Sequence, residues 1–253
     1  MPERSLAAAD VAAVLAALKA KATKRTRDGM GRYGIPSDHA WGVAVSDIRA
    51  IAKDVGRDHA LALSLWKTGV YEARLLAAFV DEPECVTSAQ MDRWARAFDN
   101  WAVCDTVCFA LFDRTPHAFA KVALWSASEK EFVKRAAFAL LASLAGHDKA
   151  SGNGAFLACL PVIERAAPDE RNFVKKGVSW ALRGVGQRNA VLHARSVTVA
   201  RRLAASAEPA ARWVGKDALR ELTSPAVAGR LARRAVERSA HGRPDRGHRS
   251  LDP

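Results

Sequence analysis

An internal repeat of about 40 residues constrains the fold more than any other feature of the sequence. The sequence FVKR at 132–135 recurs as FVKK at 173–176, and ALR at 181–183 recurs at 218–220. Between Gly and Pro positions the apolar residues follow a helical period, and no alternating strand pattern of useful length is found. Such a period in an all-helical chain predicts an all-α, HEAT-like repeat solenoid of stacked antiparallel helix pairs.

The apolar periodicity also predicts where the helices lie. Two starts are supported by capping boxes, at 87–90 and at 128–131. We expect residues 1–238 to form one helical-repeat domain and the polar segment 239–253 to be a disordered basic tail. The expected helices are 5–20, 45–55, 58–67, 70–81, 88–98, 100–113, 116–125, 129–145, 154–166, 170–187, 191–206, 209–222 and 225–237.

The charge balance favours a polyanionic partner. Lys and Arg number 39 against 27 Asp and Glu, which leaves a net charge of +12 and points first to nucleic acid. No apolar run approaches the roughly 20 residues of a spanning helix, so we expect no membrane segment. Four cysteines and scattered histidines at no ligand spacing predict a cytoplasmic protein with no metal and no cofactor. We expect a nucleoid-associated monomer.

Basic residues return at matching positions of the repeat. If equivalent helices line the inner surface of the stack, these cations form a basic concave face suited to a phosphate backbone. The alternative, that they are simply solvated faces of helices, explains each residue alone but not their return. The predicted DNA-binding residues are Lys134, Arg135, Lys175, Lys176, Arg183, Arg212, Lys216 and Arg220.

A carboxylate on an apolar helix face is the first candidate for chemistry. Asp99 is a good helix cap, and Trp101 and Asp105 follow one turn apart on one face. A carboxylate held among aromatic residues needs either a buried partner, such as a salt bridge between helices, or a ligand. The same stripe carries Cys104, Cys108, Phe109 and Phe112, and we interpret the two cysteines as core thiols.

An indole on a basic helix face is the second candidate. The face of the 170–187 helix opposite its apolar side carries Lys176, Trp180, Arg183 and Gln187. Gly177 and Gly184 lie one turn to either side of Trp180, where they either clear space for a ligand near the ring or permit close helix packing.

Arg135 emerges from a small-residue face and could orient Asp105 or bind a phosphate. Together with Trp101 and Trp180, these residues suit hydrolysis of the N-glycosidic bond of an alkylated purine. The alkylated base is a cation and a good leaving group. A carboxylate can therefore stabilise the oxocarbenium-like sugar and position water, while indoles hold cations.

The sequence resembles the AlkD-type DNA alkylation repair glycosylases from about 29 to 231. The most specific matches are DNWxxxD at 99–105, KRA at 134–136 and KxxxxWALR at 175–183, with further matches at 42–43, 65–66 and 72–74. The resemblance implies HEAT-like repeats, alkylated double-stranded DNA as partner, and release of 3- or 7-alkylpurines without drawing the base into a pocket. It places the catalytic carboxylate on Asp105, the paired tryptophans on Trp101 and Trp180, and the active-site arginine on Arg135.

One departure from the best-known branch lies near the N-terminus. That branch has a tyrosine just before the methionine of this region, whereas Gly29 precedes Met30 here and Tyr33 follows. The departure concerns the N-terminal wall of the site and the substrate range. Two alternatives stay open: a non-catalytic HEAT-repeat protein that binds DNA or RNA structures, and a protein–protein scaffold.

Overall fold

The regular elements are all helical in the part of the chain that the structure describes. The computed structural model describes residues 11–241, with side chains as far as Arg234. Its elements are α1 (Val11–Ala20), α2 (Lys24–Gly29), η1 (Met30–Tyr33), α3 (Val45–Val55), α4 (His59–Lys67), α5 (Tyr71–Val80), α6 (Ser88–Arg96), α7 (Trp101–Ala110), η2 (Phe112–Arg114), α8 (Ala118–Trp125), α9 (Glu131–His147), α10 (Asn153–Ala166), α11 (Asn172–Gly186), α12 (Ala190–Ala204), α13 (Pro209–Leu222) and α14 (Pro225–His241). The predicted all-α fold is confirmed.

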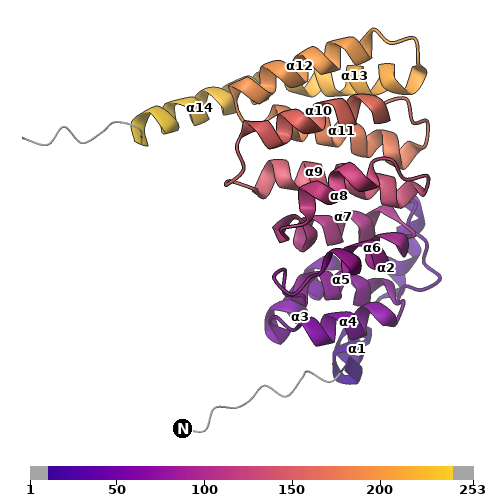
Figure 1. The fold of residues 1–253 in the computed structure, drawn as a ribbon. Helices are drawn as coiled ribbons and strands as arrows, with labels where there is room; N and C mark the ends of the chain where they lie inside the picture. The colour runs from indigo at the N-terminus through magenta and orange to yellow at the C-terminus, as the bar shows by residue number, and fades with distance from the viewer. Residues whose placement is uncertain (1–10, 242–253) are drawn as a thin grey trace, which may run out of the picture.

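The helices stack in two layers (Figure 1). In the first layer α3, α5, α7, α9, α11 and α13 each pack against the next, and in the second α10 packs between α8 and α12. Helix α1 lies at one end of the stack and α12 and α13 at the other, where α14 leaves it to one side. No helix in the described range is long and apolar enough to cross a membrane.

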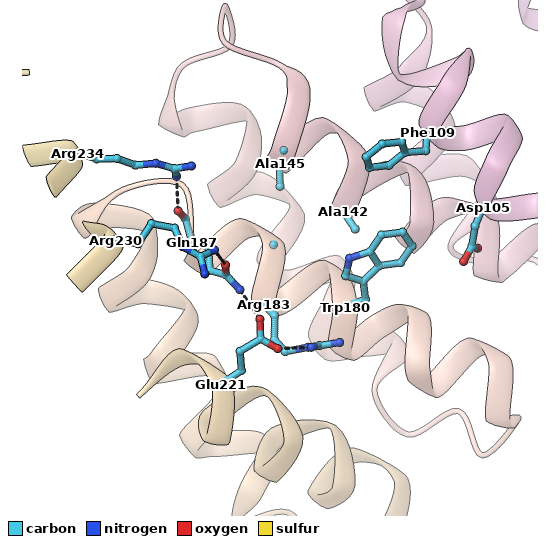
Figure 2. Close-up of a pocket in the computed structure, with 12 residues that line it drawn as sticks. Asp105, Phe109, Ala142, Ala145, Trp180, Arg183, Gln187, Glu221, Arg230 and Arg234 are labelled. Atoms are coloured by element: carbon cyan, nitrogen blue, oxygen red, sulfur yellow. Dashed lines mark hydrogen bonds and ion pairs between the residues drawn. The ribbon is translucent and has the colours of Figure 1, made fainter. Parts of the chain in front are cut away.

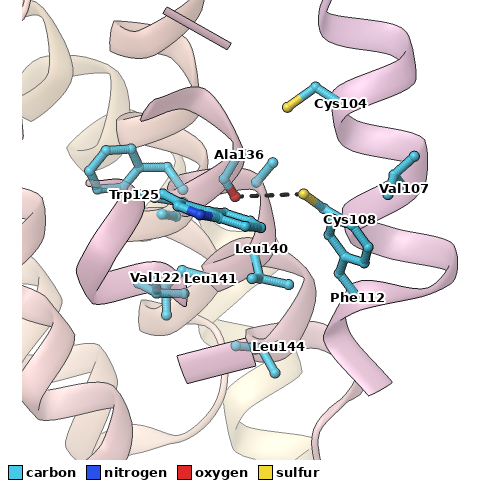
Figure 3. Close-up of a cluster of buried hydrophobic side chains, with 14 of the residues drawn as sticks. Cys104, Val107, Cys108, Phe112, Val122, Trp125, Ala136, Leu140, Leu141 and Leu144 are labelled. Carbon is cyan, nitrogen blue, oxygen red and sulfur yellow. Dashed lines mark hydrogen bonds between the residues drawn. The ribbon is translucent and has the colours of Figure 1, made fainter. Parts of the chain in front are cut away.

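The seam between α7 and α9 shows how the core is built (Figure 3). The buried thiols of Cys104 and Cys108 face α9 and donate to the main-chain oxygens of Phe132 and Ala136, over 3.5 and 3.6 Å. Both cysteines are free and fully buried, as the interpretation as core thiols requires. Because these thiols reach main-chain oxygens of α9, α7 is held close to α9.

The N-terminal segment contains helical turns where the sequence predicted a loop. Helix α2 and turn η1 are short and glycine-containing, so their pattern is too brief to detect. The segment that follows is fixed to α5 by the buried carboxylate of Glu72, which accepts from the amides of Trp41, Gly42 and Val43. Gly42 has a φ of 89°, and a β-carbon there would lie 2.4 Å from the Thr23 oxygen. The residues at 42–43 and 72, which were among the matches to the family pattern, therefore act in folding.

The two predicted capping boxes have different outcomes. The Thr87 hydroxyl accepts from the Gln90 amide at 3.1 Å, and α6 begins there as predicted. In the second box Ser128 accepts from the amide of Lys130, and α9 begins later, at Glu131. The expectation for residues 5–10 lies outside the described residues. Helix α14 reaches His241, and the rest of the predicted tail, 242–253, is likewise outside them.

Candidate functional site

The start of α7 sets the direction of its functional side chains. Asn100, rather than the predicted Asp99, caps the helix by accepting from the Val103 amide at 3.0 Å. Asp99 instead forms an ion pair with Arg74 at 3.1 Å and accepts from the side chain of Asn100. The helix therefore starts at residue 101, and Asp105 lies one turn further, facing α9.

Asp105 is paired with Arg135 across the α7–α9 seam. The arginine donates Nε–H and Nη2–H to the two carboxylate oxygens, over 2.8 and 2.6 Å, and its Nη1 donates to the Phe173 main-chain oxygen at 2.7 Å. The Arg135 side chain is 8% exposed and that of Asp105 is 18% exposed. The helix-to-helix salt bridge considered from the sequence is present, and the carboxylate keeps one edge accessible.

Burial and pairing act in opposite directions on this acid. Burial raises the pKa of the Asp105 carboxyl above its ordinary value, and the hydrogen bonds and charge of Arg135 oppose the increase. For the arginine, burial lowers the pKa, but the carboxylate outweighs it and the net pKa of Arg135 is raised. The bidentate guanidinium therefore keeps a mostly buried carboxylate charged and fixes its orientation.

Asp105 opens onto a cavity of about 630 Å³ on the first helix layer (Figure 2). The Trp180 ring lies beside it, from α11, and Phe109 of α7 lies on the same side of the close-up. The floor between them is made of small residues of α9 and α11. The full lining is Asp105, Phe109, Ala142, Ala145, Gly146, Trp180, Arg183, Gly184, Gln187, Glu221, Arg230 and Arg234.

The two glycines beside Trp180 have different roles. A β-carbon on Gly177 would lie 3.5 Å from the Phe138 β-carbon, and this residue is absent from the described cavity lining. Gly177 therefore packs against α9, which is the second of the two alternatives for this glycine. Gly184 borders the cavity, and a β-carbon there would lie 3.4 Å from that of Ala145.

Trp101 lies apart from this cavity, toward the N-terminal segment. Its indole N–H donates to the Tyr33 main-chain oxygen at 2.8 Å, and it packs against the small cluster that contains Met30 and Ile35. The lining described above does not include it. Tyr33, the residue noted in the departure from the family pattern, is 69% exposed. The structure thus brings Asp105, Arg135 and Trp180 together and places Trp101 on an adjoining surface.

Several of the predicted DNA-binding cations have acidic partners. Lys134 pairs with Asp169 at 2.9 Å and Arg183 pairs with Glu221, so these two acids come from the following repeat, and the repeat pattern alone did not reveal the pairing. Arg220 pairs with Asp217 of its own helix, three residues earlier in the chain. The first two pairs link neighbouring repeats, and all three reduce the excess positive charge of this surface.

The other predicted cations are arranged differently. The Lys175 ammonium lies 5.0 Å from the centre of the exposed Trp213 ring, and Arg212 donates to main-chain oxygens of the loop before α13. Lys176 and Lys216 are exposed on α11 and α13.

A second basic cavity, of about 540 Å³, was not predicted from the sequence. Its lining holds four exposed cations, Arg49, Lys53 and Arg57 from α3 and its C-terminal end and Arg114 from η2, and no acidic residue. Phe109, 42% exposed, borders both cavities. The spacing of four residues between Arg49 and Lys53 puts them on one face of α3, which was the available signal.

The fold and this site define an α-helical repeat protein with an acid, an indole and cations on one helix layer. Residues 14–222 match the family described as DNA alkylation repair enzyme, and the chain belongs to that family. The predicted resemblance is thus confirmed at the level of the family.

Comparison with solved structures agrees with the fold. The chain is similar to a protein described as belonging to a new family related to the HEAT-like repeat DNA glycosylases, with affinity for branched DNA structures. That match has 21% identity and a TM-score of 0.72, and it covers 88% of this chain and 96% of the other. A designed armadillo repeat protein in complex with a (KR)4 peptide has 11% identity and a TM-score of 0.36, covering 81% and 86%, which is too low to support an argument. No curated protein matches the sequence.

Proposed function

We propose that this protein hydrolyses the N-glycosidic bond of cationic 3- or 7-alkylpurines in duplex DNA and leaves an abasic site. The observation that carries the proposal is the Asp105 carboxylate, which Arg135 holds by two hydrogen bonds at the edge of a cavity shared with Trp180. A preoriented anion in a partly desolvated site stabilises a positive charge far better than one in bulk water.

The protein need do little to activate the leaving group, because the alkylated purine is already a cation. The bond between C1′ and the ring nitrogen breaks, its electron pair neutralises the cationic purine, and the sugar takes on oxocarbenium character. The fixed carboxylate of Asp105 stabilises that positive charge and orients a water molecule. The water oxygen then bonds to C1′ and its proton passes to solvent, so no strong general acid is required.

The tryptophans and cations hold the substrate. Trp180, beside Asp105 in the cavity, presents a ring face to the cationic base, an attraction of about 0.5–2 kcal/mol. Trp101 contacts the adjoining backbone. Arg135 acts on the carboxylate, since three of its five donors are engaged within the protein. Exposed cations such as Lys176 and Lys216 contact phosphates.

Incubation with a duplex oligonucleotide that carries one 7-methylguanine tests the proposal. We expect free 7-methylguanine by mass spectrometry and a strand that breaks on mild alkali treatment, as an abasic site requires. The matched duplex with unmodified guanine is the control. A protein that binds the damaged duplex tightly and releases no base would refute the glycosylase proposal.

A second candidate function is non-catalytic binding of branched DNA. It is favoured by the complete pairing of both Asp105 oxygens with Arg135, an arrangement that also serves a purely structural ion pair. The solved relative with 21% identity is described as having affinity for branched DNA structures. Competition between a four-way junction and a linear duplex of the same length separates the two functions, because this candidate predicts strong preference for the junction and no base release.

A further inference from the structure

Helix α14 lies outside the residues that match the family. The match ends at residue 222, and α14 begins at Pro225 and extends away from the stack (Figure 1). Its first ten residues contain three arginines and no acid. Val227 is 2% exposed and anchors the start of the helix, whereas Arg230, Arg233 and Arg234 are exposed. The helix is therefore a basic arm with a small apolar root.

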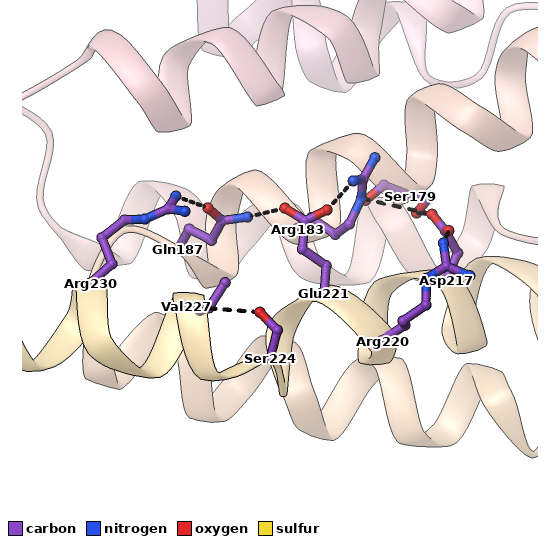
Figure 4. A network of polar contacts seen from close by, with 9 residues as sticks. All are labelled: Ser179, Arg183, Gln187, Asp217, Arg220, Glu221, Ser224, Val227 and Arg230. Atoms are coloured by element: carbon purple, nitrogen blue, oxygen red, sulfur yellow. Dashed lines mark hydrogen bonds and ion pairs between the residues drawn. The ribbon is translucent and has the colours of Figure 1, made fainter.

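Gln187, at the end of α11, fastens this arm to the stack (Figure 4). Its side-chain oxygen accepts from Arg230, and its main-chain oxygen accepts from Arg234 at 2.7 Å. Its side-chain amide donates to Glu221 of α13 at 2.6 Å, and the other oxygen of that carboxylate pairs with Arg183. One residue thus connects α14 to both α11 and α13 and fixes where the two arginines lie.

The arm changes the charge of the cavity that holds Asp105. Arg230 and Arg234 both line that cavity. Of the other charged groups in its lining, Asp105 is paired with Arg135 and Arg183 is paired with Glu221. Arg230 donates to a neutral amide oxygen, which leaves its charge for an external anion. Arg230 of α14 therefore brings positive charge to this end of the cavity.

We propose that α14 is a DNA-contacting arm whose Arg230 and Arg234 bind phosphates of the duplex beside the lesion. This inference rests on the proposed function, because the partner is the duplex that presents the base to Asp105. The two arginines are four residues apart, so they lie about 6 Å apart along the helix axis and can engage separate phosphates of one strand. Gln187 positions the arm before DNA binds.

The test compares full-length Arg230→Gln/Arg234→Gln with the matched variant Arg195→Gln/Arg201→Gln. Each pair removes two exposed arginines, and the control pair lies on α12, which contributes nothing to the described lining of the cavity. Affinity for an undamaged duplex is measured over a salt series. We expect the slope of log K against log salt to fall by about 2 for the α14 variant, since each lost phosphate contact removes about 0.9. The control slope stays at the wild-type value.

The outcomes separate the arm from the catalytic proposal. Equal slopes for the α14 variant, the control and the wild type would refute the proposal that α14 contacts DNA. That result would leave the glycosylase proposal standing. A reduced slope in a protein that releases no base would support the arm and refute only the glycosylase. A wild type that binds no duplex would overturn both. Gln187→Ala, which changes no charge, is expected to weaken duplex binding several-fold, and wild-type affinity in this variant would refute the positioning role.

Discussion

Replacing Arg135 with methionine tests whether the guanidinium maintains Asp105 as a charged group. The change removes two hydrogen bonds to the carboxylate and one to the Phe173 oxygen and leaves an acid that is 18% exposed without its partner. Removing one member of a buried pair costs about 3–5 kcal/mol of unfolding free energy. Part of that cost is the Phe173 contact, so the coupling between the two charged groups is about 2–4 kcal/mol.

A double-mutant cycle measures this coupling. Urea unfolding is compared for the wild type, Arg135→Met, Asp105→Asn and the double variant, and the contribution of the Phe173 contact cancels in the cycle. The pH dependence gives a second readout. Burial raises the pKa of Asp105, and loss of the arginine raises it further, so the ionised acid destabilises Arg135→Met most at neutral pH.

The direction of the change in stability with pH identifies Asp105 as its cause. Protonation of Asp105 relieves the penalty, and we expect Arg135→Met to recover stability relative to the wild type as the pH falls from 7 toward about 4. The double variant has no carboxylate at this position and should not recover. Additive single-variant effects together with a pH-independent loss in Arg135→Met would show that the arginine acts only through packing.

Three further predictions concern other parts of the molecule. Trp180→Leu should slow base release by about 2- to 30-fold in single-turnover assays, as loss of one cation–π contact implies, and an unchanged rate would exclude contact with the base. Glu72→Ala should lower unfolding free energy by roughly 3 kcal/mol in urea titrations, since three backbone amides lose their acceptor. Arg171 and Lys134 lower the pKa of Asp169, so Asp169→Asn should cost about 1–3 kcal/mol at pH 7. The cost should shrink progressively below about pH 4, where this carboxyl takes up a proton in the unfolded chain while the folded protein still holds it ionised; a constant loss would contradict this.

The helical order was predictable because most helices bury a periodic apolar face. Helices over 45–55 and 209–222 have the predicted bounds. The sequence failed where two residues compete locally. Asp99 and Asn100 can both cap a helix, and the choice depends on Arg74, which lies 25 residues away in the chain and engages the acid. Such a partner is visible only after the repeats have stacked.

The candidate site was likewise predicted only in part from the sequence. The stripe of α7 showed that Asp105 needs a buried partner or a ligand, and the sequence supplied Arg135 as a possible partner. It did not show that Trp101 faces the N-terminal segment, because that depends on the carbonyl of Tyr33. Nor did it show that Lys134, one of the predicted DNA-binding cations, is neutralised by an acid from the following repeat. Repeat spacing identifies equivalent positions but carries no information on their partners.

The central claim is that the Asp105 carboxylate stabilises charge in the reacting sugar, and single-turnover release of 7-methylguanine by Asp105→Asn tests it most directly. Asp99→Asn is the matched control, because it makes the same chemical change near the same helix start and lies outside the lining of the Asp105 cavity. We expect the rate to fall on the order of 100-fold or more in Asp105→Asn, with duplex affinity retained, and to be unchanged in Asp99→Asn. Release by Asp105→Asn at the wild-type rate would contradict the account.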